Sequence, residues 1–236
     1  MTPSQNKAPA SQDYPHNALL DSLLCTDAMA AAQFLLSGGL AVYPTETFFG
    51  LGCRADNAEA VQRIFAVKRR ASDMPLPVIL ASVAQLSLVA EPSASIAADL
   101  PALTALWPAP LTLLLPARSG LPHALTGGTG RIALRVSPHP AARALAAACG
   151  FPIVSSSANI SGRSPVTQAE QLDPDLLSSL RPGLDTVFAS PTPAPEGGLP
   201  STIVEVLGSR RLLLRREGAL PISHLVEVGF TLIPRA

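Results

Sequence analysis

Residues 40–70, LAVYPTETFFGLGCRADNAEAVQRIFAVKRR, decide how the chain folds. The run Leu40–Tyr43 is short and apolar, as is typical of a buried strand, and Asn57–Arg69 carries apolar residues at helical spacing. Between them lie two threonines, a glutamate and two closely spaced glycines. A strand, a polar turn and a helix in this order predict an α/β unit. The helix ends in three cations, Lys68–Arg70.

The basic cluster Lys68–Arg70 is distinctive because lysine occurs at only two positions in the chain. The other lysine, Lys7, lies in residues 1–17, whose Pro, Ala, Ser and Gln content predicts a flexible tail. We therefore expect Lys68 to be the one ammonium of the folded part. Together with the hydroxyls and carboxylate of Thr45–Thr47, the cluster indicates a site for an anionic small molecule. The alternative is a solvated helix end favoured by the helix dipole.

The length and composition predict one compact domain with a sizeable core, or at most two small ones. The chain has 236 residues, of which 47% are hydrophobic and 14% charged, and its formal net charge is zero. Zero net charge argues against nucleic acid as the main ligand, although a chain of zero net charge can still carry a local basic groove. The cysteines Cys25, Cys53 and Cys149 form no metal-binding pattern and are expected in the core of a reduced, cytoplasmic protein. We expect no membrane span and no signal peptide.

The rest of the chain alternates expected strands with expected helices. Strands are predicted at Pro77–Leu80, Leu111–Leu115, Ile132–Val136 and Ile153–Ser155, with a hairpin at Thr202–Val206 and Arg211–Arg215. Helices are predicted at Thr26–Leu36 and Pro140–Cys149, and two more after Ser82 and Ser93. Residues 190–200 are rich in Pro and Gly and predict a loop. The alternation predicts an α/β domain with a mixed sheet that is covered on both faces.

Common nucleotide-binding and hydrolase motifs do not explain the site. Gly50–Ala55 matches the GxGxxA pattern of dinucleotide-binding folds, but polar and prolyl residues separate its first glycine from the preceding strand. Gly127–Arg131 is glycine-rich without the Lys-Ser/Thr of a P-loop, and no GxSxG elbow occurs. His139 is expected to have a capping or structural role.

Hydroxyl groups and arginines follow several of the predicted strands. Ser155–Gly162, SSSANISG, supplies hydroxyls, an amide and backbone N–H groups at the carboxyl end of a strand, where ligands bind in open α/β sheets. Arg135 lies inside an apolar strand, where a buried cation needs a partner or an anion, and Arg215 ends another strand. The arginines expected to face solvent are Arg210, Arg211 and Arg216. These residues alone predict binding of a phosphorylated or carboxylated small molecule by positioning and charge neutralisation.

Six stretches occur in one order over roughly residues 20–220. They are AVYPTETFFGLGCRA, IFAVKRRASDMPLPV, LWPAPLTLLLPA, RIALRVSPHPAARAL, FPIVSSSANISGRSPVT and STIVEVLGSRRLLLRREGAL. Together they resemble YrdC-type threonylcarbamoyl-AMP synthases (the YrdC/TsaC family) in their short, single-domain form. The resemblance implies a catalytic domain over residues 18–220, with a C-terminal tail segment at 221–236. It also implies a twisted mixed sheet flanked by helices around a deep basic cleft.

The resemblance further implies a nucleotidyltransferase that converts L-threonine, bicarbonate and ATP, with Mg²⁺ accompanying the triphosphate, into L-threonylcarbamoyladenylate and pyrophosphate. The product feeds N6-threonylcarbamoyladenosine formation at position 37 of tRNA through a separate tRNA threonylcarbamoyltransferase complex in the cytoplasm. Weak binding of tRNA is compatible with the same cleft. The alternatives are a non-catalytic RNA- or tRNA-binding module, a hydrogenase-maturation carbamoyltransferase relative, or a plain interaction domain.

Site residues follow from the same resemblance, position by position. The expected catalytic residues are Lys68 and Arg70, with Arg69 pointing elsewhere, and no protein metal ligand is implied. The expected threonine contacts are Thr47, Arg135, Ser157 and Ser201. The expected nucleotide contacts are Arg70, Met74, Asn159, Thr167 and Arg215. Departures from the family pattern occur at Phe48-Phe49, Ile79 and Ala109. Ile79 replaces a histidine that some members place near threonine, so that contact is not expected here.

Overall fold

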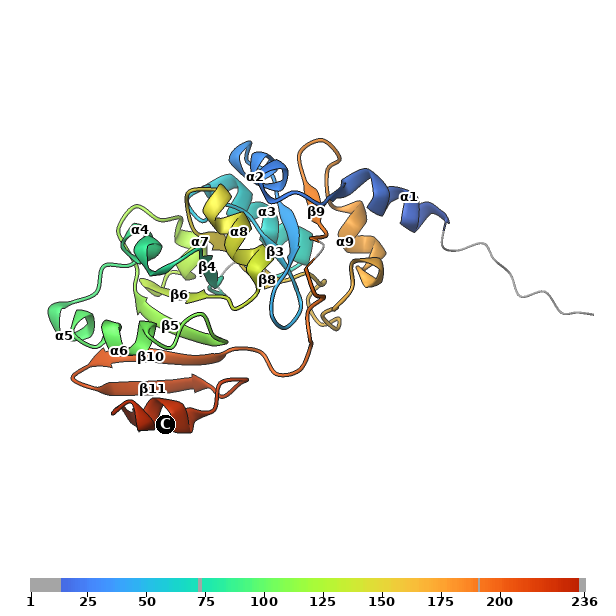
Figure 1. Ribbon diagram of the computed structural model, residues 1–236. Helices are drawn as coiled ribbons and strands as arrows, with labels where there is room; N and C mark the ends of the chain where they lie inside the picture. Colours follow the sequence, from blue (N-terminus) through green and yellow to red (C-terminus); the bar gives the residue numbers. More distant parts are fainter. Residues whose placement is uncertain (1–13, 72–73, 191, 234–236) are drawn as a thin grey trace, which may run out of the picture.

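The computed structural model describes residues 14–71, 74–190 and 192–233 (Figure 1). The helices are α1 Tyr14–Leu23, α2 Ala28–Leu36, α3 Ala58–Lys68, α4 Leu86–Val89, α5 Ala94–Ala97, α6 Leu100–Thr104, α7 His123–Thr126, α8 Pro140–Ala148, α9 Pro174–Ser178 and α10 Ile222–Glu227. Short 3-10 helices are η1 Val83–Gln85 and η2 Ala169–Gln171. The strands are β1 Leu24–Cys25, β2 Ala41–Pro44, β3 Phe49–Gly52, β4 Val78–Leu80, β5 Leu111–Pro116, β6 Arg131–Val136, β7 Ile153–Val154, β8 Ser156–Ser157, β9 Thr186–Phe188, β10 Thr202–Gly208, β11 Arg211–Arg216 and β12 Thr231–Ile233.

The strands form two mixed sheets. The first has the order β1-β9-β2-β3-β8, and the second has the order β12-β11-β10-β5-β6-β4-β7. Each combines parallel and antiparallel neighbours: β2 is parallel to β9 and antiparallel to β3, and β10 is parallel to β5 and antiparallel to β11. The predicted α/β class with mixed strand directions is confirmed, but the strands divide between two sheets instead of forming one.

Residues 40–43, most of which belong to strand β2, show why a strand that is covered on both faces is apolar at every position. Leu40 and Val42 enter the larger hydrophobic core, whereas Ala41 and Tyr43 enter a second core with residues of α2 and α8. Successive side chains of a strand point to opposite faces, so a strand covered on both faces needs an apolar residue at each position. Figure 1 shows α2, α3 and α8 grouped at one end of the molecule and the hairpin β10–β11 at the other.

Helix α3 begins and ends as the sequence predicts. The side chain of Asn57 accepts a hydrogen bond from the backbone N–H of Ala60 at 2.9 Å, which satisfies a free donor of the first turn. Arg69 adopts the left-handed conformation with φ 50° and ends the helix. Its side chain is therefore turned outward and pairs with Asp175 at 3.6 Å, as expected for the cation that points elsewhere.

The two sheets meet where the chain crosses from β7 to β8. Val154 pairs within the second sheet, and Ser156 pairs with Leu51 of β3 in the first. Gly52 lies against this crossing, because a Cβ atom there would come within 1.9 Å of the Val154 carbonyl oxygen. The hydroxyl of Tyr43 donates a hydrogen bond to the same carbonyl at 2.7 Å. The approach of the sheets thus requires a glycine at position 52.

Several elements differ from the sequence prediction. The helix expected at Thr26–Leu36 begins two residues later, and its N-cap is Asp27. The segments after Ser82 and Ser93 form four short helical pieces, η1 and α4 to α6, instead of two long helices. Pro101 lies in the first turn of α6 and lacks the N–H that would continue the helix from α5.

The two chain ends also carry structure that was not predicted. Residues 1–13 of the predicted tail lie outside the described residues, while residues 14–17 begin helix α1. Residues 222–233 contain helix α10 and strand β12, and β12 pairs in parallel with β11. Within the described part of the chain, no helix is both long enough and apolar enough to cross a membrane.

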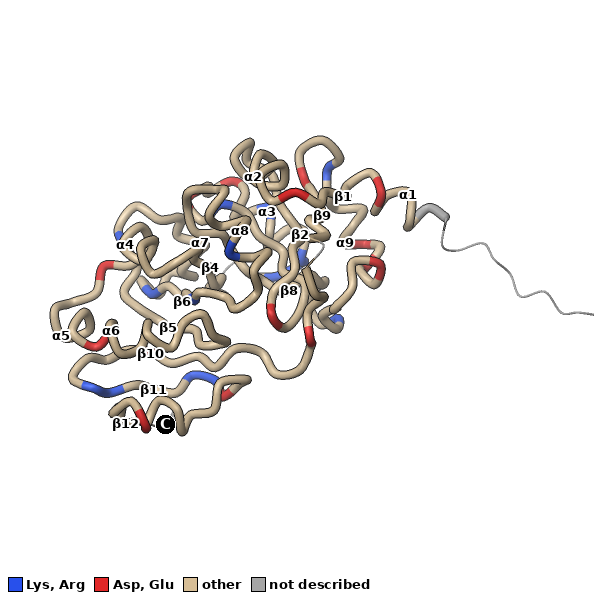
Figure 2. Tube along the Cα trace, in the orientation of Figure 1, with Lys and Arg blue, Asp and Glu red and all other residues tan. Residues whose placement is uncertain are grey.

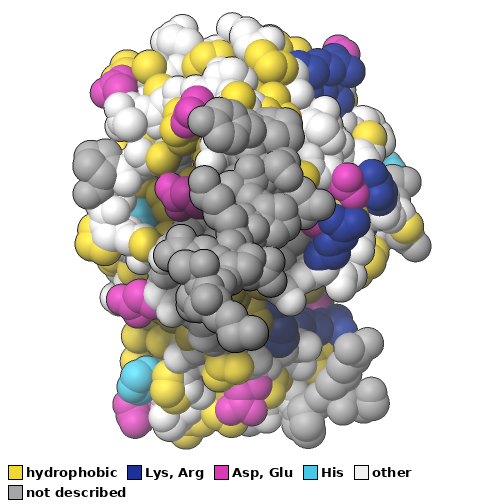
Figure 3. All heavy atoms as spheres, turned by 90° about the vertical axis from the view of Figure 1, so that its right-hand side faces the viewer, with side chains coloured by type: hydrophobic (Ala, Val, Ile, Leu, Met, Phe, Trp, Pro, Cys, Tyr) yellow, Lys and Arg dark blue, Asp and Glu magenta, His cyan; other side chains and the backbone are white. Residues whose placement is uncertain are grey.

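Charged residues are distributed in pairs over much of the surface. Figure 2 shows basic residues at both ends of β11, and Figure 3 shows several basic side chains directly beside acidic ones. Arg163, for example, pairs with Asp175 at 2.9 Å and also with Asp173. Exposed pairs of this kind contribute little stability, but they neutralise one another's charge.

We predict that Gly52→Ala lowers the free energy of unfolding by about 3 kcal/mol or more, because the new methyl group overlaps the Val154 carbonyl. The matched control is Gly50→Ala in the same strand, where a Cβ would meet its nearest neighbours at an ordinary 3.5 Å. Urea unfolding followed by circular dichroism measures both variants. Equal stability of the two variants would contradict the close approach at the crossing.

Candidate active site

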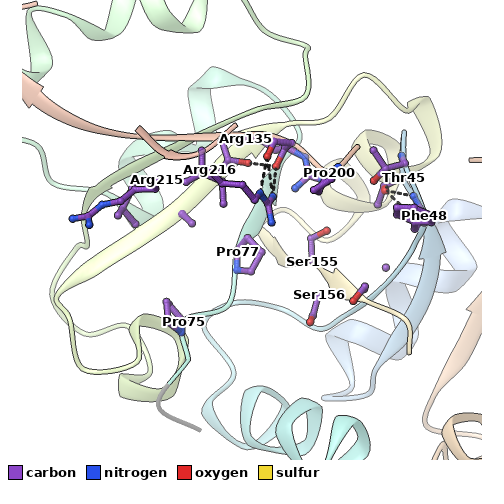
Figure 4. A pocket seen from close by; sticks show the side chains of 18 of the residues that line it. Thr45, Phe48, Pro75, Pro77, Arg135, Ser155, Ser156, Pro200, Arg215 and Arg216 are labelled. Carbon is purple, nitrogen blue, oxygen red and sulfur yellow. Dashed lines mark hydrogen bonds between the residues drawn. The ribbon is translucent and has the colours of Figure 1, made fainter. Parts of the chain in front are cut away.

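A cavity of about 1240 Å³ lies between one face of the second sheet and the polar segments that follow β2, α3 and β7 (Figure 4). Its floor consists of alternate residues of three neighbouring strands, as the two-residue period of a strand requires. The floor residues are Thr112 and Leu114 of β5, Arg131, Ala133 and Arg135 of β6, and Ser201, Ile203 and Glu205 along β10.

A bulge in β11 adds two consecutive arginines to the same face. Ile203 pairs with Arg216 and Val204 with Leu214, so Arg215 is an extra residue opposite a single step of β10. The bulge interrupts the normal alternation, and both Arg215 and Arg216 line the cavity. Figure 4 shows Arg216 extending toward Arg135 and Pro200, while Arg215 points the other way along the cavity.

The opposite wall is built from the two hydroxyl-rich segments that the sequence singled out. Thr45 and Thr47 come from the turn after β2, and Ser155–Ser157 come from the crossing between the sheets. Arg70 and Met74 stand beyond the end of α3 on the same wall. Figure 4 shows Ser155 and Ser156 across the cavity from Arg135 and Arg216. Hydroxyls therefore face guanidinium groups across one space.

Five arginines make the cavity positive, and one acidic residue on its floor is shared between two of them. Glu205 is buried, and its carboxylate pairs with Arg131 at 3.0 Å and accepts hydrogen bonds from Arg215, with Nε at 2.9 Å. Because one carboxylate serves two guanidinium groups, this end of the cavity keeps a positive charge. The expected basic cleft is present.

Arg135 is held by a second carboxylate at the other end of β6. Its Nε donates to Glu46 Oε1 at 3.0 Å, and Ser137 Oγ donates to Glu46 Oε2 at 2.5 Å. The side chain of Arg135 is only 8% exposed, so this partner meets the need for charge compensation that the sequence indicated. Since Glu46 bonds the Nε side, the terminal amino groups are the part of the guanidinium oriented to meet an anion.

The environment of Glu46 favours its ionised form. Burial alone would raise the pKa of its carboxyl group, but the charge of Arg135 and the hydrogen bond from Ser137 outweigh burial, and the pKa lies below its ordinary value. Glu46 is therefore a fixed negative charge at neutral pH and is poorly suited to accept protons.

Arg216 and Ser201 form a third polar group on the floor. Arg216 donates to the backbone carbonyl of Ser201, with Nη2 at 2.9 Å, and the Ser201 hydroxyl lies 2.8 Å from that of Thr112. Burial, followed by the positive charge of Arg135, lowers the pKa of Arg216. An anion between these two arginines would relieve their repulsion.

Lys68 lies behind the serine wall and does not line the cavity. The residue is only 3% exposed, and its ammonium donates hydrogen bonds to the backbone carbonyls of Ser157 and Asn159, the latter at 2.7 Å. Burial, followed by the positive charge of Arg70, lowers its pKa to about 8. Its contacts are thus with the chain and not with the space where a ligand fits.

Seven of the ten expected site residues are brought together by the fold. The residues that line the cavity are Thr47, Arg70, Met74, Arg135, Ser157, Ser201 and Arg215, and those that do not are Lys68, Asn159 and Thr167. The Asn159 side-chain amide donates to the carbonyls of Ile160 and Arg163, and the Thr167 methyl lies near Gly197.

Two lining arginines were missed by the sequence prediction. Arg131 lies two and four residues before Ala133 and Arg135, so strand alternation from Arg135 is a signal that could have found it. Arg216 was expected to face solvent, and that expectation is wrong because the bulge places it beside Arg215. The bulge is defined by the pairing of β11 with β10, and no feature of the sequence indicates it.

Within the predicted loop at 190–200, residues 196 and 197 lie against the threonine-rich turn. The N–H of Gly197 donates to the Thr47 carbonyl at 2.7 Å, and that of Glu196 to the Glu46 carbonyl at 3.2 Å. His139 precedes helix α8, makes no side-chain cap, and contacts the Pro193 carbonyl at 3.0 Å. A second cavity of about 430 Å³ lies on the far side of Thr47.

The carboxylates at the cavity do not form a resident metal site. Glu46 and Glu205 are bonded to arginines, and the described residues contain no group of three or more His, Cys, Asp or Glu side chains that could hold a metal ion. A magnesium ion bound to a nucleotide triphosphate would enter with its ligand.

The sequence matches a known protein family. The family model Sua5_yciO_yrdC, described as Telomere recombination, covers residues 33–217. The threonylcarbamoyl-AMP synthase of Idiomarina loihiensis is 40% identical over 146 residues, which are 62% of this chain and 78% of the relative. That of Xanthomonas campestris pv. campestris (strain B100) is 38% identical over 170 residues, 71% of this chain and 91% of the relative.

The fold is also similar to solved structures. Pyrococcus abyssi Sua5 complexed with L-threonine has a TM-score of 0.76 and 30% identity, over 89% of this chain and 62% of that chain. This chain therefore spans less than two thirds of the archaeal protein. Escherichia coli YciO has a TM-score of 0.67 and 19% identity over 86% of this chain and 97% of that chain, which supports the fold alone.

We predict that Glu46→Gln lowers the free energy of unfolding at pH 7 by about 1–3 kcal/mol, because Arg135 loses its charged partner. The folded-state pKa of Glu46 lies below its unfolded value, so its contribution is present at neutral pH and is lost as the pH falls through the folded pKa. The difference between wild type and variant should shrink as the pH falls below about 4. Urea titrations across this range measure it, with the exposed Glu196→Gln as control. If the difference in unfolding free energy between wild type and Glu46→Gln does not change with pH, Glu46 is not stabilised as an ionised partner of Arg135.

Proposed function

The chain belongs to the Sua5/YciO/YrdC family, and on that premise we propose that it is a threonylcarbamoyl-AMP synthase. The reaction joins L-threonine, bicarbonate and ATP to give L-threonylcarbamoyl-AMP and pyrophosphate, which makes the protein a nucleotidyltransferase of tRNA modification. One observation carries the proposal: five arginines and a row of hydroxyls line a single cavity, while its neighbouring carboxylates are paired. Such a site stabilises negative charge instead of transferring protons.

The end of the cavity near Arg135 suits L-threonine. A guanidinium group binds a carboxylate through two parallel hydrogen bonds, and Glu46 already fixes its orientation. Thr47, Ser157 and Ser201 line the same cavity, and in this proposal their hydroxyl groups contact the amino acid. In this arrangement the threonine carboxylate lies on Arg135, and the amine points into the cavity.

The remaining arginines suit the triphosphate and nucleoside of ATP. Arg70 and Arg215 both line the cavity. Met74 also lines the cavity and is available to contact the nucleoside. Asn159 and Thr167 reach a nucleotide only if the segments that carry them move, because neither lines the cavity here. Mg²⁺ enters as part of MgATP.

The chemistry requires two anions to meet. The threonine amine takes up CO₂ derived from bicarbonate and becomes a carbamate. The carbamate oxygen then attacks the α-phosphorus of ATP, the bond to the bridging oxygen breaks, and pyrophosphate leaves. Fixed guanidinium groups reduce the repulsion between carbamate and triphosphate and stabilise the charge that develops at the leaving oxygens.

The boundaries and partners of the enzyme follow from the same proposal. Residues 18–220 form the catalytic domain, and the helix and strand within 221–236 extend its second sheet. The product passes to a tRNA threonylcarbamoyltransferase complex in the cytoplasm. Bound tRNA is a weaker candidate ligand, because the net charge of the chain is zero and exposed arginines such as Arg163 pair with neighbouring carboxylates.

We predict pyrophosphate release that requires ATP, L-threonine and bicarbonate together. A coupled phosphate assay measures the rate, with each substrate omitted in turn. Release that continues without threonine or bicarbonate would refute the proposed reaction. Salt-sensitive RNA binding without turnover would favour the RNA-binding alternative.

Arg70→Met should lower kcat/KM for ATP by about a hundredfold, since it removes one positive charge from the wall of the cavity. Arg118→Met is the control, because that guanidinium is exposed and bonds to the Ser87 carbonyl away from the cavity. Steady-state kinetics with saturating threonine and bicarbonate measure both variants. Equal effects of the two substitutions would remove Arg70 from the site.

A further inference from the structure

Lys68 is the basic residue of the Lys68–Arg70 cluster whose position agrees least with contact to a substrate. It ends helix α3, is buried, and is absent from the cavity lining, whereas Arg70, two residues later, lines the cavity. In this structure the ammonium of Lys68 therefore does not face the space that a phosphate would occupy. Its role has to be sought in the atoms that it does contact.

Those atoms belong to one turn, residues 157–161. The ammonium of Lys68 donates to the carbonyls of Ser157 and Asn159, and the N–H of Ser161 donates to the backbone carbonyl of Lys68 at 2.9 Å. Three hydrogen bonds thus join one residue of α3 to the turn. We call residues 157–161 the serine turn.

The other side of the serine turn is held by strand β3. Ser157 pairs with Gly50, and the N–H of Ala158 donates to the Phe49 carbonyl at 2.8 Å. The turn is therefore fixed between β3 and the end of α3, with the exposed Ser157 at the cavity. Any shift of the turn moves that hydroxyl.

Electrostatics explain why a lysine is suited to this position. Two carbonyl oxygens point to one place, where their partial negative charges repel each other. An ammonium satisfies both oxygens with charge-assisted hydrogen bonds and neutralises their repulsion. The pKa of Lys68, lowered to about 8 by burial and by Arg70, agrees with a group that water hardly reaches.

We propose that Lys68 is a positioning residue of the reaction, whose ammonium holds the serine turn and so places the Ser157 hydroxyl at the threonine end of the cavity. This replaces the catalytic role expected from the sequence, and it rests on the proposed function. Arg70 remains the cation of the pair that acts on the nucleotide.

The two possible roles of Lys68 separate in the binding of single substrates. A lysine that contacts phosphate affects ATP and leaves L-threonine binding unchanged. A lysine that positions the serine turn affects L-threonine even when no nucleotide is present. Isothermal calorimetry with L-threonine alone and with MgATP alone therefore decides between them, using wild type, Lys68→Met, Lys68→Gln and Arg70→Met.

The expected result is a roughly tenfold or greater loss of L-threonine affinity in Lys68→Met, because the carbonyls of Ser157 and Asn159 lose their partner. Lys68→Gln keeps N–H donors without the charge and should lose less, and it serves as the milder variant if Lys68→Met does not fold. Arg70→Met should weaken MgATP binding and leave L-threonine binding close to wild type. In amide NMR spectra, the signals of Ala158 and Ser161 should shift in the Lys68 variants and stay in place in Arg70→Met.

Two outcomes refute different statements. If the wild-type protein binds neither L-threonine nor MgATP, the proposed function is refuted. Lys68 variants that bind L-threonine as wild type does, and lose only MgATP affinity, would refute the positioning role and leave the proposed function standing. The positioning role is also refuted if Lys68→Gln and Lys68→Met lose MgATP affinity equally and keep their affinity for L-threonine.

Discussion

The close contact between Gly52 and the Val154 carbonyl is the constraint on which the rest of the structure depends. It allows the chain to cross from one sheet to the other, with Tyr43 bonded to the same carbonyl. The crossing places the serines directly after β7 opposite the floor of the second sheet. A bulkier residue at position 52 would push the two sheets apart. The hydroxyl groups of the wall and the arginines of the floor would then no longer face one cavity.

Charge is organised in the cavity by sharing. Two carboxylates, the partly buried Glu46 and the buried Glu205, hold three arginines, Arg131, Arg135 and Arg215, so each guanidinium is oriented before a ligand arrives. Because three arginines share two carboxylates, a net positive charge remains to attract an anion. The arginines repel one another less than they would without the carboxylates. Preorganisation of this kind is where electrostatic stabilisation of a transition state originates.

The sequence predicted the parts of this protein that local chemistry decides. The bounds and the apolar face of α3 and the hairpin β10–β11 follow from residue type and spacing alone. What it could not predict depends on pairing between distant segments. The division into two sheets rests on the crossing after Val154, and the position of Arg216 rests on one extra residue in β11. Lys68 shows the same limit. Its position two residues before Arg70 suggests that the two cations share a role. The structure separates them, because Arg69 between them is left-handed and the ammonium of Lys68 is buried.

The sealed ammonium of Lys68 has a consequence for the chemistry of the whole surface. From residue 14 to the end of the chain, Lys68 is the one lysine, and all other fixed positive side chains there are arginines. Acylating reagents, amine-directed cross-linkers and lysine-modifying enzymes therefore find a single target in this stretch, closed off beneath the serine turn. Modification of that amine would report how often the turn opens, in the way that hydrogen exchange reports the opening of a helix.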